Sequence, residues 1–234
     1  MEPLHKVYEA FSANLLPKSV FDLINNRFSL VLEGITRIEK ASGIRFPVVY
    51  VEPSVVLSSA PNSFDYGILF ARTIPVFSNN SVQIIIQISA PLIAYGLKGT
   101  IHAILAHEFL HYLELISRLS KMNIVSDELS SNLFENVYTD NTRLFESQSV
   151  FDDKTLLQHI TKKFPSGFRD YKLEDKVLKF WIGKNLPTLK TTLDTNTVKL
   201  DAKLLSQLEI NPMLLKKLGQ IQLKNSKIRK KKIY

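Results

Sequence analysis

Ala106-His107-Glu108-Phe109-Leu110-His111 lies inside a helix-forming apolar stretch that no proline or glycine interrupts between residues 100 and 123. Two histidines four residues apart lie about 40° apart around a helix of ~3.6 residues per turn. Both imidazoles can therefore point at one metal ion, and Glu108 lies close enough to hydrogen-bond a water on that metal. The pattern predicts a metal site for hydrolysis, with His107 and His111 as ligands and Glu108 as the general base.

This stretch resembles the active-site helix of the zincin metallopeptidases. No glycine and third histidine follow it, which argues against the metzincin branch. A gluzincin-like arrangement, in which a glutamate of a following helix is the third ligand, is the better match. The resemblance covers residues 80–148, and only the His-Glu-x-x-His part is specific. It implies a zinc-dependent (Zn²⁺) peptidase that acts on a peptide or protein substrate.

A zinc site with an open position for water needs three protein ligands, and the chain has no cysteine. A second helix is predicted from Asp127 to about Ser147. If the motif helix continues to about Lys121, it ends ~15 Å past His111, and an antiparallel helix must return by a similar distance. Measured along the second helix from its start, Glu135 lies ~14 Å back toward the level of His111, whereas Glu128 lies only ~3 Å back. We therefore predict that Glu135 is the third ligand.

The third ligand has alternatives. Glu128 would replace Glu135 if the motif helix ended near Leu115, and the sequence around Glu128 resembles that of some gluzincin glutamate helices. Glu114 and His159 are weaker candidates. Around the site, Asp140 or Glu114 could accept a ring N–H of a ligand histidine. The resemblance also implies a later side chain that steadies an oxyanion, and the candidates are His159, Tyr138 and Tyr171.

The rest of the chain predicts an α+β fold. Residues 4–15 and 19–42 have the apolar period of helices, and strands are predicted at residues 46–51, 66–72 and 74–77. Residues 82–88 alternate like a half-buried strand. Their place before the motif helix resembles the edge strand on which zincins hold a substrate backbone. We expect a small mixed sheet whose edge strand packs on the active-site helix, followed by a mostly helical C-terminal part.

Three segments are expected: a zincin-like metallopeptidase domain at 1–185, a helical C-terminal extension at 186–223 and a basic, disordered tail at 224–234. Residues 216–234 hold eight lysines and arginines and no acid, whereas the other 22 basic residues equal the 22 acidic ones. Only the tail therefore gives an electrostatic reason to bind nucleic acid. A merely solubilising role for the tail is the alternative, and it is slightly favoured.

The compartment follows from what the sequence lacks. The N-terminus has no apolar signal-peptide core, and the most apolar run, residues 82–97, is too short to span a membrane. We expect a cytoplasmic protein with no membrane partner.

Two classes of function remain, a zinc metallopeptidase and a non-catalytic zincin-fold module that acts through protein or nucleic-acid contacts. Glu108 favours the first, because a structural zinc site needs no water-activating carboxylate. Hydrolysis of a non-peptide amide is a third, weaker hypothesis.

Overall fold

The structure is a computed structural model, and it describes residues 2–59, 66–78, 81–121, 145–165, 167–192 and 210–232. Four residues of the predicted site lie outside these ranges: Glu128, Glu135, Tyr138 and Asp140. The helix predicted to carry the two glutamates therefore stays a prediction.

Three helices open the chain: α1 (His5–Ser12), α2 (Lys18–Arg27) and α3 (Ser29–Ser42). The single helix predicted over residues 19–42 is thus two helices, which meet at Phe28. Gly43 ends α3, with a φ of 63°. Glycine adopts this left-handed conformation without steric cost, so it terminates the helix and lets the chain turn toward the first strand.

Two three-stranded mixed sheets follow. The first has the order β1 (Val49–Glu52), β5 (Ser81–Ser89), β4 (Ala71–Ser78), and β5 runs parallel to β1 and antiparallel to β4. The second has the order β3 (Tyr66–Leu69), β2 (Val55–Ser59), β6 (Thr188–Thr192), and β2 runs antiparallel to β3 and parallel to β6. The predicted α+β class with small mixed sheets is confirmed. Although β6 lies in the stretch assigned to a C-terminal extension, it pairs with β2.

The expectation that residues 82–88 form the edge strand is wrong, because β5 is the central strand of its sheet. Ile84, Ile86 and Ile88 are buried on one face, and Gln87 is buried on the other. Gln87 accepts a hydrogen bond from Arg72 at 2.5 Å, so its amide is satisfied by protein rather than by water. The alternating pattern therefore predicts a strand but not its position in the sheet. Among the described strands, the edge beside the motif helix is β4.

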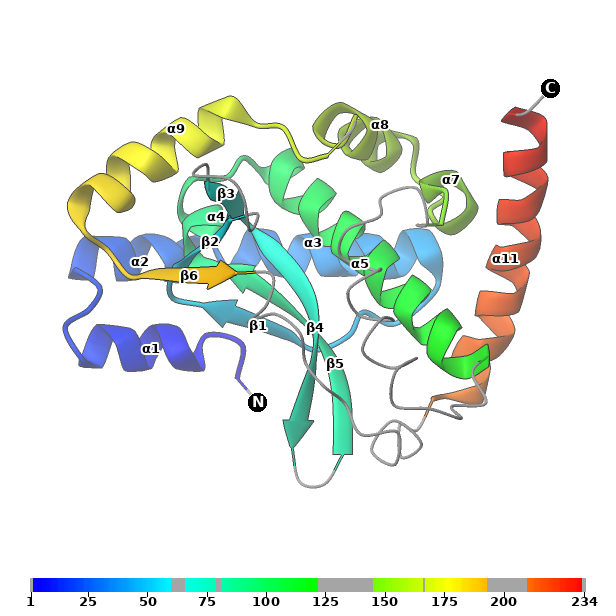
Figure 1. The fold of residues 1–234 in the computed structure, drawn as a ribbon, viewed down its shortest axis with the longest axis horizontal. Coiled ribbons are helices and arrows are strands. Elements are labelled where there is room, and N and C mark those ends of the chain that lie inside the picture. Colours follow the sequence, from blue (N-terminus) through cyan, green and yellow to red (C-terminus); the bar gives the residue numbers. More distant parts are fainter. Residues whose placement is uncertain are drawn as a thin grey trace.

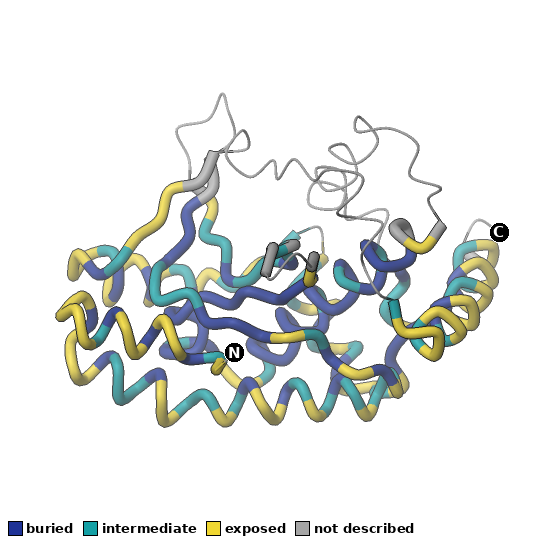
Figure 2. The backbone as a smooth tube through the Cα atoms, turned by 90° about the horizontal axis from the view of Figure 1, so that it is seen from below, coloured by how far each residue is buried: buried dark blue, intermediate teal, exposed yellow. Residues whose placement is uncertain are grey.

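The motif helix is α5 (Lys98–Lys121), which follows β5 after the short α4 (Ala90–Tyr95). It packs on β4 and β5, while α3 and α8 (Lys154–Lys163) pack against it (Figure 1). Ile101, Leu105 and Phe109 have no exposed surface. Figure 2 shows buried residues gathered in the strands and in α5, with exposed residues on the outer helices. The motif therefore lies in the core of the fold.

The C-terminal part is mostly helical, as predicted. Besides α8 it contains α7 (Ser147–Val150), α9 (Tyr171–Phe180), the 3-10 helix η2 (Ile182–Lys184) and α11 (Pro212–Lys232). Residues 224–232, expected to be disordered, are instead the last turns of α11. They continue a helix whose Leu218 and Ile221 are buried on the body, and within them Asn225 is buried and accepts a hydrogen bond from the Glu146 backbone N–H. None of the helices in the described part of the chain has the length and apolar character to cross a bilayer.

Candidate metal centre

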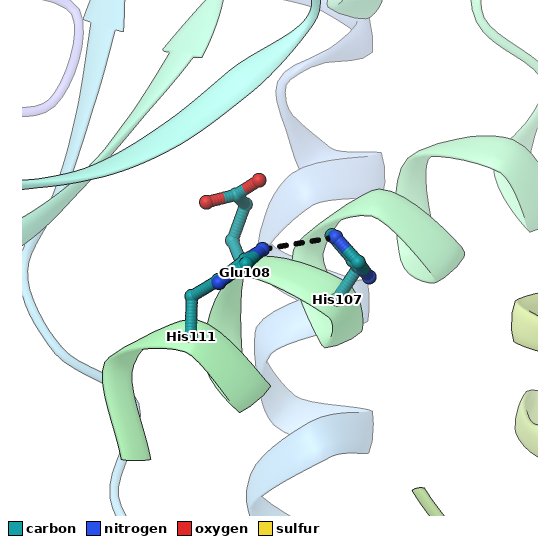
Figure 3. A group of neighbouring side chains, drawn as sticks. All are labelled: His107, Glu108 and His111. Carbon is teal, nitrogen blue, oxygen red and sulfur yellow. Dashed lines mark hydrogen bonds between the residues drawn. The ribbon is translucent and has the colours of Figure 1, made fainter. Parts of the chain in front are cut away.

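The three motif side chains come together on α5, as the spacing predicts. His107, Glu108 and His111 each offer a ligand atom, and these atoms lie within 4.8 Å of one another (Figure 3). The two Nε2 atoms are 3.0 Å apart, and the imidazole rings are nearly perpendicular, at 85°. Within the described ranges this is the one cluster of three histidine, cysteine or acidic side chains that could hold a metal ion.

Packing fixes the orientation of His107. Its ring stacks on Phe164, which follows the last residue of α8, with the ring centroids 3.9 Å apart and the planes at 9°. The C-terminal end of α8 thus contacts the site through the aromatic ring of Phe164. Because the ring lies flat on Phe164, rotation of His107 away from His111 would break this contact.

The Glu108 carboxylate is held by the edge strand. The hydroxyl of Thr73 on β4 lies 2.9 Å from Glu108 Oε2 and 3.0 Å from the Glu108 carbonyl oxygen. Both side chains are buried. Burial raises the pKa of Glu108 to about 7, while the hydrogen bonds from Thr73 act in the opposite direction. One carboxylate oxygen is therefore held by Thr73, and the group binds a proton more readily than a solvent-exposed glutamate does.

The histidines are suited to bind a cation. Burial, and to a lesser extent the neighbouring His111, lower the pKa of His107 to about 3, so this ring is neutral at pH 7. A neutral imidazole carries a lone pair on one nitrogen, which is the form that binds metals. Without a metal, one Nε2–H donates to the other Nε2. With a metal, both Nε2 lone pairs would face the ion.

The spacing of the nitrogens fits a metal ion. Zinc binds imidazole nitrogen at ~2.0–2.1 Å, so two ligands at a tetrahedral angle are about 3.3 Å apart. The observed 3.0 Å between His107 Nε2 and His111 Nε2 is close to that value. Two imidazoles and a carboxylate also suit other divalent transition metals. The geometry therefore shows a cluster able to hold a metal ion, without showing which ion.

The other predicted residues are not part of this cluster. Glu135 and Glu128 lie outside the described residues, as do Tyr138 and Asp140. The ring of His159 packs on Gly99, eight residues before His107 and thus about 12 Å away along the helix. Tyr171 begins α9 with 71% of its surface exposed, which does not suit a side chain that steadies an oxyanion in a buried site. Glu114 is on α5 but does not join the three clustered residues.

Sequence reasoning missed two residues that shape the site, Thr73 and Phe164. Thr73 is 35 positions from Glu108, and Phe164 is farther along the chain from His107. Neither lies in a motif, because each reaches the site through tertiary packing. Only the tendency of a buried carboxylate to recruit a hydroxyl donor could have indicated that a residue like Thr73 exists.

Comparisons of the chain with protein-family models, with curated proteins and with solved structures give no match. The function is therefore inferred from the geometry of the cluster on α5.

Proposed function

We propose that the protein is a zincin-like, zinc-dependent metallopeptidase, with His107 and His111 as zinc ligands and Glu108 as general base. The observation that carries the proposal is the pair of Nε2 atoms 3.0 Å apart with the Glu108 carboxylate within 4.8 Å. Two neutral nitrogen ligands beside a buried carboxylate are what zinc hydrolysis requires. Glu135 stays the predicted third ligand, with Glu128 as its alternative.

A bound zinc ion would supply Lewis-acid activation of a water and of a peptide carbonyl. The positive charge of such an ion would also lower the pKa of Glu108 from about 7, which favours the carboxylate form at neutral pH.

Glu108 moves the proton in this proposal. The Thr73 hydroxyl holds Oε2, and the carboxylate of Glu108 would take a proton from the attacking water. The same carboxyl group would then give the proton to the leaving amine as the peptide bond breaks. Thr73 keeps the carboxylate in one orientation through both transfers.

The substrate is proposed to be an extended peptide or protein segment that adds to β4. This strand is the edge of its sheet among the described strands, and it carries Thr73, the contact to Glu108. An exposed edge can accept a further strand through main-chain hydrogen bonds. Pro75 within β4 is compatible with an edge position, where a missing N–H is tolerated.

Metal content and hydrolysis, measured on the same preparations, test the proposal. We expect unmodified protein to bind one zinc ion by elemental analysis and to cleave casein or a peptide library. His107→Ala should lose both properties. Glu108→Gln should keep zinc and lose activity by about 10²- to 10⁴-fold.

His5→Ala is the matched control, because His5 is exposed on α1 and far from the motif in the sequence. This variant should keep both zinc and activity. Protein that takes up no zinc, or a Glu108→Gln variant with undiminished hydrolysis, would refute the proposal.

A further inference from the structure

Helix α11 has one strongly basic outward face. Five lysines, at positions 216, 224, 227, 230 and 231, are exposed and lie within about 120° of one another around the helix, at ~100° per residue. We call this set the lysine face. It extends over about 22 Å along the helix axis. No acidic residue occurs in α11, whose place at the outer edge of the molecule is visible in Figure 1.

The opposite face of α11 is fixed to the body. Leu218 and Ile221 are buried, and the Asn225 side-chain oxygen accepts a hydrogen bond at 2.7 Å from the backbone N–H of Glu146, just before α7. Gln222 donates to the Ser117 hydroxyl of α5 at 2.5 Å. The lysine face is therefore held in one orientation, unlike the lysines of a disordered, solubilising tail.

We propose that the lysine face is a sequence-independent binding surface for the phosphate backbone of double-helical nucleic acid. The charge distribution supports this partner. Residues 216–234 carry eight basic residues, and the rest of the chain is balanced at 22 basic and 22 acidic residues. The net charge of +8 thus belongs to this end of the chain and attracts a polyanion there.

The chemistry of the lysine face favours a duplex over other polyanions. An amphipathic helix enters a bilayer by burying its apolar face, but that face of α11 already packs on α5 and α7. Two exposed apolar side chains share this face, Leu223 among the lysines and Met213 in the first turn of the helix, but two such side chains ten residues apart do not anchor a helix in lipid. The lysine face has no aromatic ring on which single-stranded bases could stack. Lysine binds phosphate as a point charge and does not read bases by bidentate contacts, so no sequence preference is expected.

Fluorescence anisotropy with the full chain tests this proposal. Two 20-base-pair DNA duplexes of unrelated sequence should bind equally well. Each lysine–phosphate contact adds about −0.9 to the slope of log K against log salt concentration. Contacts by most of the five lysines therefore predict an affinity loss of about two orders of magnitude between 50 and 200 mM NaCl. A flat salt dependence would overturn the proposal.

A triple variant, Lys216→Gln, Lys224→Gln and Lys227→Gln, should weaken duplex binding at least tenfold and flatten the slope. Glutamine keeps helix propensity, and circular dichroism checks the fold. The matched control changes three exposed lysines of α9 (Lys172, Lys176 and Lys179) to glutamine, for the same change in net charge. The control should bind nearly as well as the unmodified chain.

Other outcomes separate the alternatives. Equal losses in the two triple variants would show that only net charge matters. Tighter binding to single-stranded oligothymidylate, or to vesicles with 30% phosphatidylserine, than to the duplex would replace the proposed partner. The salt dependence of the unmodified chain tests the idea even if a variant misfolds. His107→Ala should still bind the duplex, so this inference can fail or hold independently of the metallopeptidase.

Discussion

The contact between Thr73 and Glu108 links the motif helix to the sheet through two buried side chains. Thr73→Val keeps the shape of the side chain and removes the hydroxyl that lies 2.9 Å from Glu108 Oε2. A buried carboxylate that loses its donor is destabilised by about 1–3 kcal/mol. We expect the free energy of unfolding in urea, measured with a chelator present, to fall by that amount.

The same variant should lower the rate of peptide hydrolysis about tenfold or more while zinc content is unchanged, since the carboxylate loses its fixed orientation. Thr36→Val is the control, because Thr36 is on the surface of α3 and its hydroxyl donates to the Leu32 carbonyl within its own helix. This change should alter stability by less than about 0.5 kcal/mol. If Thr73→Val and Thr36→Val behaved alike, the Thr73 hydroxyl would have no role in holding Glu108.

Among the helices and strands, the sequence predicts the features that are set by residues close together in the chain. The motif helix and its three clustered side chains follow from a four-residue spacing, and the strand at residues 82–88 follows from alternation. The sequence does not show that β5 is a central strand. Gln87 has the polarity of a solvent-facing residue, but it is paired with Arg72 inside the sheet. The sequence does not predict that α11 continues beyond Leu223. The many lysines there are typical of a disordered tail, although one side of the helix is buried.

A second link between elements joins α3 to α8. Arg37 donates from Nε and a terminal nitrogen to the two carboxylate oxygens of Asp153, at 2.6 and 2.8 Å. Asp153 also caps α8 by accepting a hydrogen bond from the Leu156 N–H. The Arg37 guanidinium, together with the backbone N–H groups of the cap, lowers the Asp153 pKa from 3.8 to about 2. The carboxylate therefore favours the folded state when it is ionised.

This ion pair makes stability depend on pH in a defined direction. Because the folded pKa of Asp153 lies below the unfolded value, its contribution is complete above about pH 5 and is lost as the pH falls through 3.8 toward 2. Asp153→Asn keeps an oxygen for the cap and loses the charge. We expect it to reduce the free energy of unfolding by about 2 kcal/mol at pH 7, and by much less near pH 2.

Urea unfolding of both proteins across this pH range measures the difference. Asp22→Asn is the control, because Asp22 pairs with Lys18 on the exposed side of α2. An exposed pair contributes only a few tenths of a kcal/mol. A stability difference between Asp153→Asn and the parent that stayed constant with pH would contradict the assigned ion pair.

Across the whole molecule, two features of different chemistry meet on α5. The histidine cluster lies within the core between β4 and α8, and the C-terminal half of the same helix receives α11 through Ser117 and Gln222. The metal site is held by packing between α5, β4 and α8, whereas the basic surface belongs to the single helix α11. Outside residues 216–234 the chain has as many basic as acidic residues. Disturbing either feature should therefore leave the other intact, unless α5 itself unfolds.

Metal binding should stabilise the whole fold, because the two histidines approach each other only when α5 is formed and packed. A ligand that binds only the folded state, at a free concentration 100 times its dissociation constant, adds about 2.7 kcal/mol to the free energy of unfolding. For a chain of this size the gain raises the melting temperature by roughly 5–10 °C. Scanning calorimetry of chelator-treated protein, with and without added zinc, measures the shift.

Variants of single histidines show which residues the zinc-induced rise in melting temperature depends on. His111→Ala should melt at one temperature with and without zinc, whereas His5→Ala should show the full shift. Magnesium should have little effect, since it prefers oxygen ligands to imidazole. If His111→Ala still showed the zinc-induced shift, the ion would bind elsewhere on the chain. If the unmodified protein melted at the same temperature in zinc and in chelator, the buried histidine pair would be only a hydrogen-bonded part of the core.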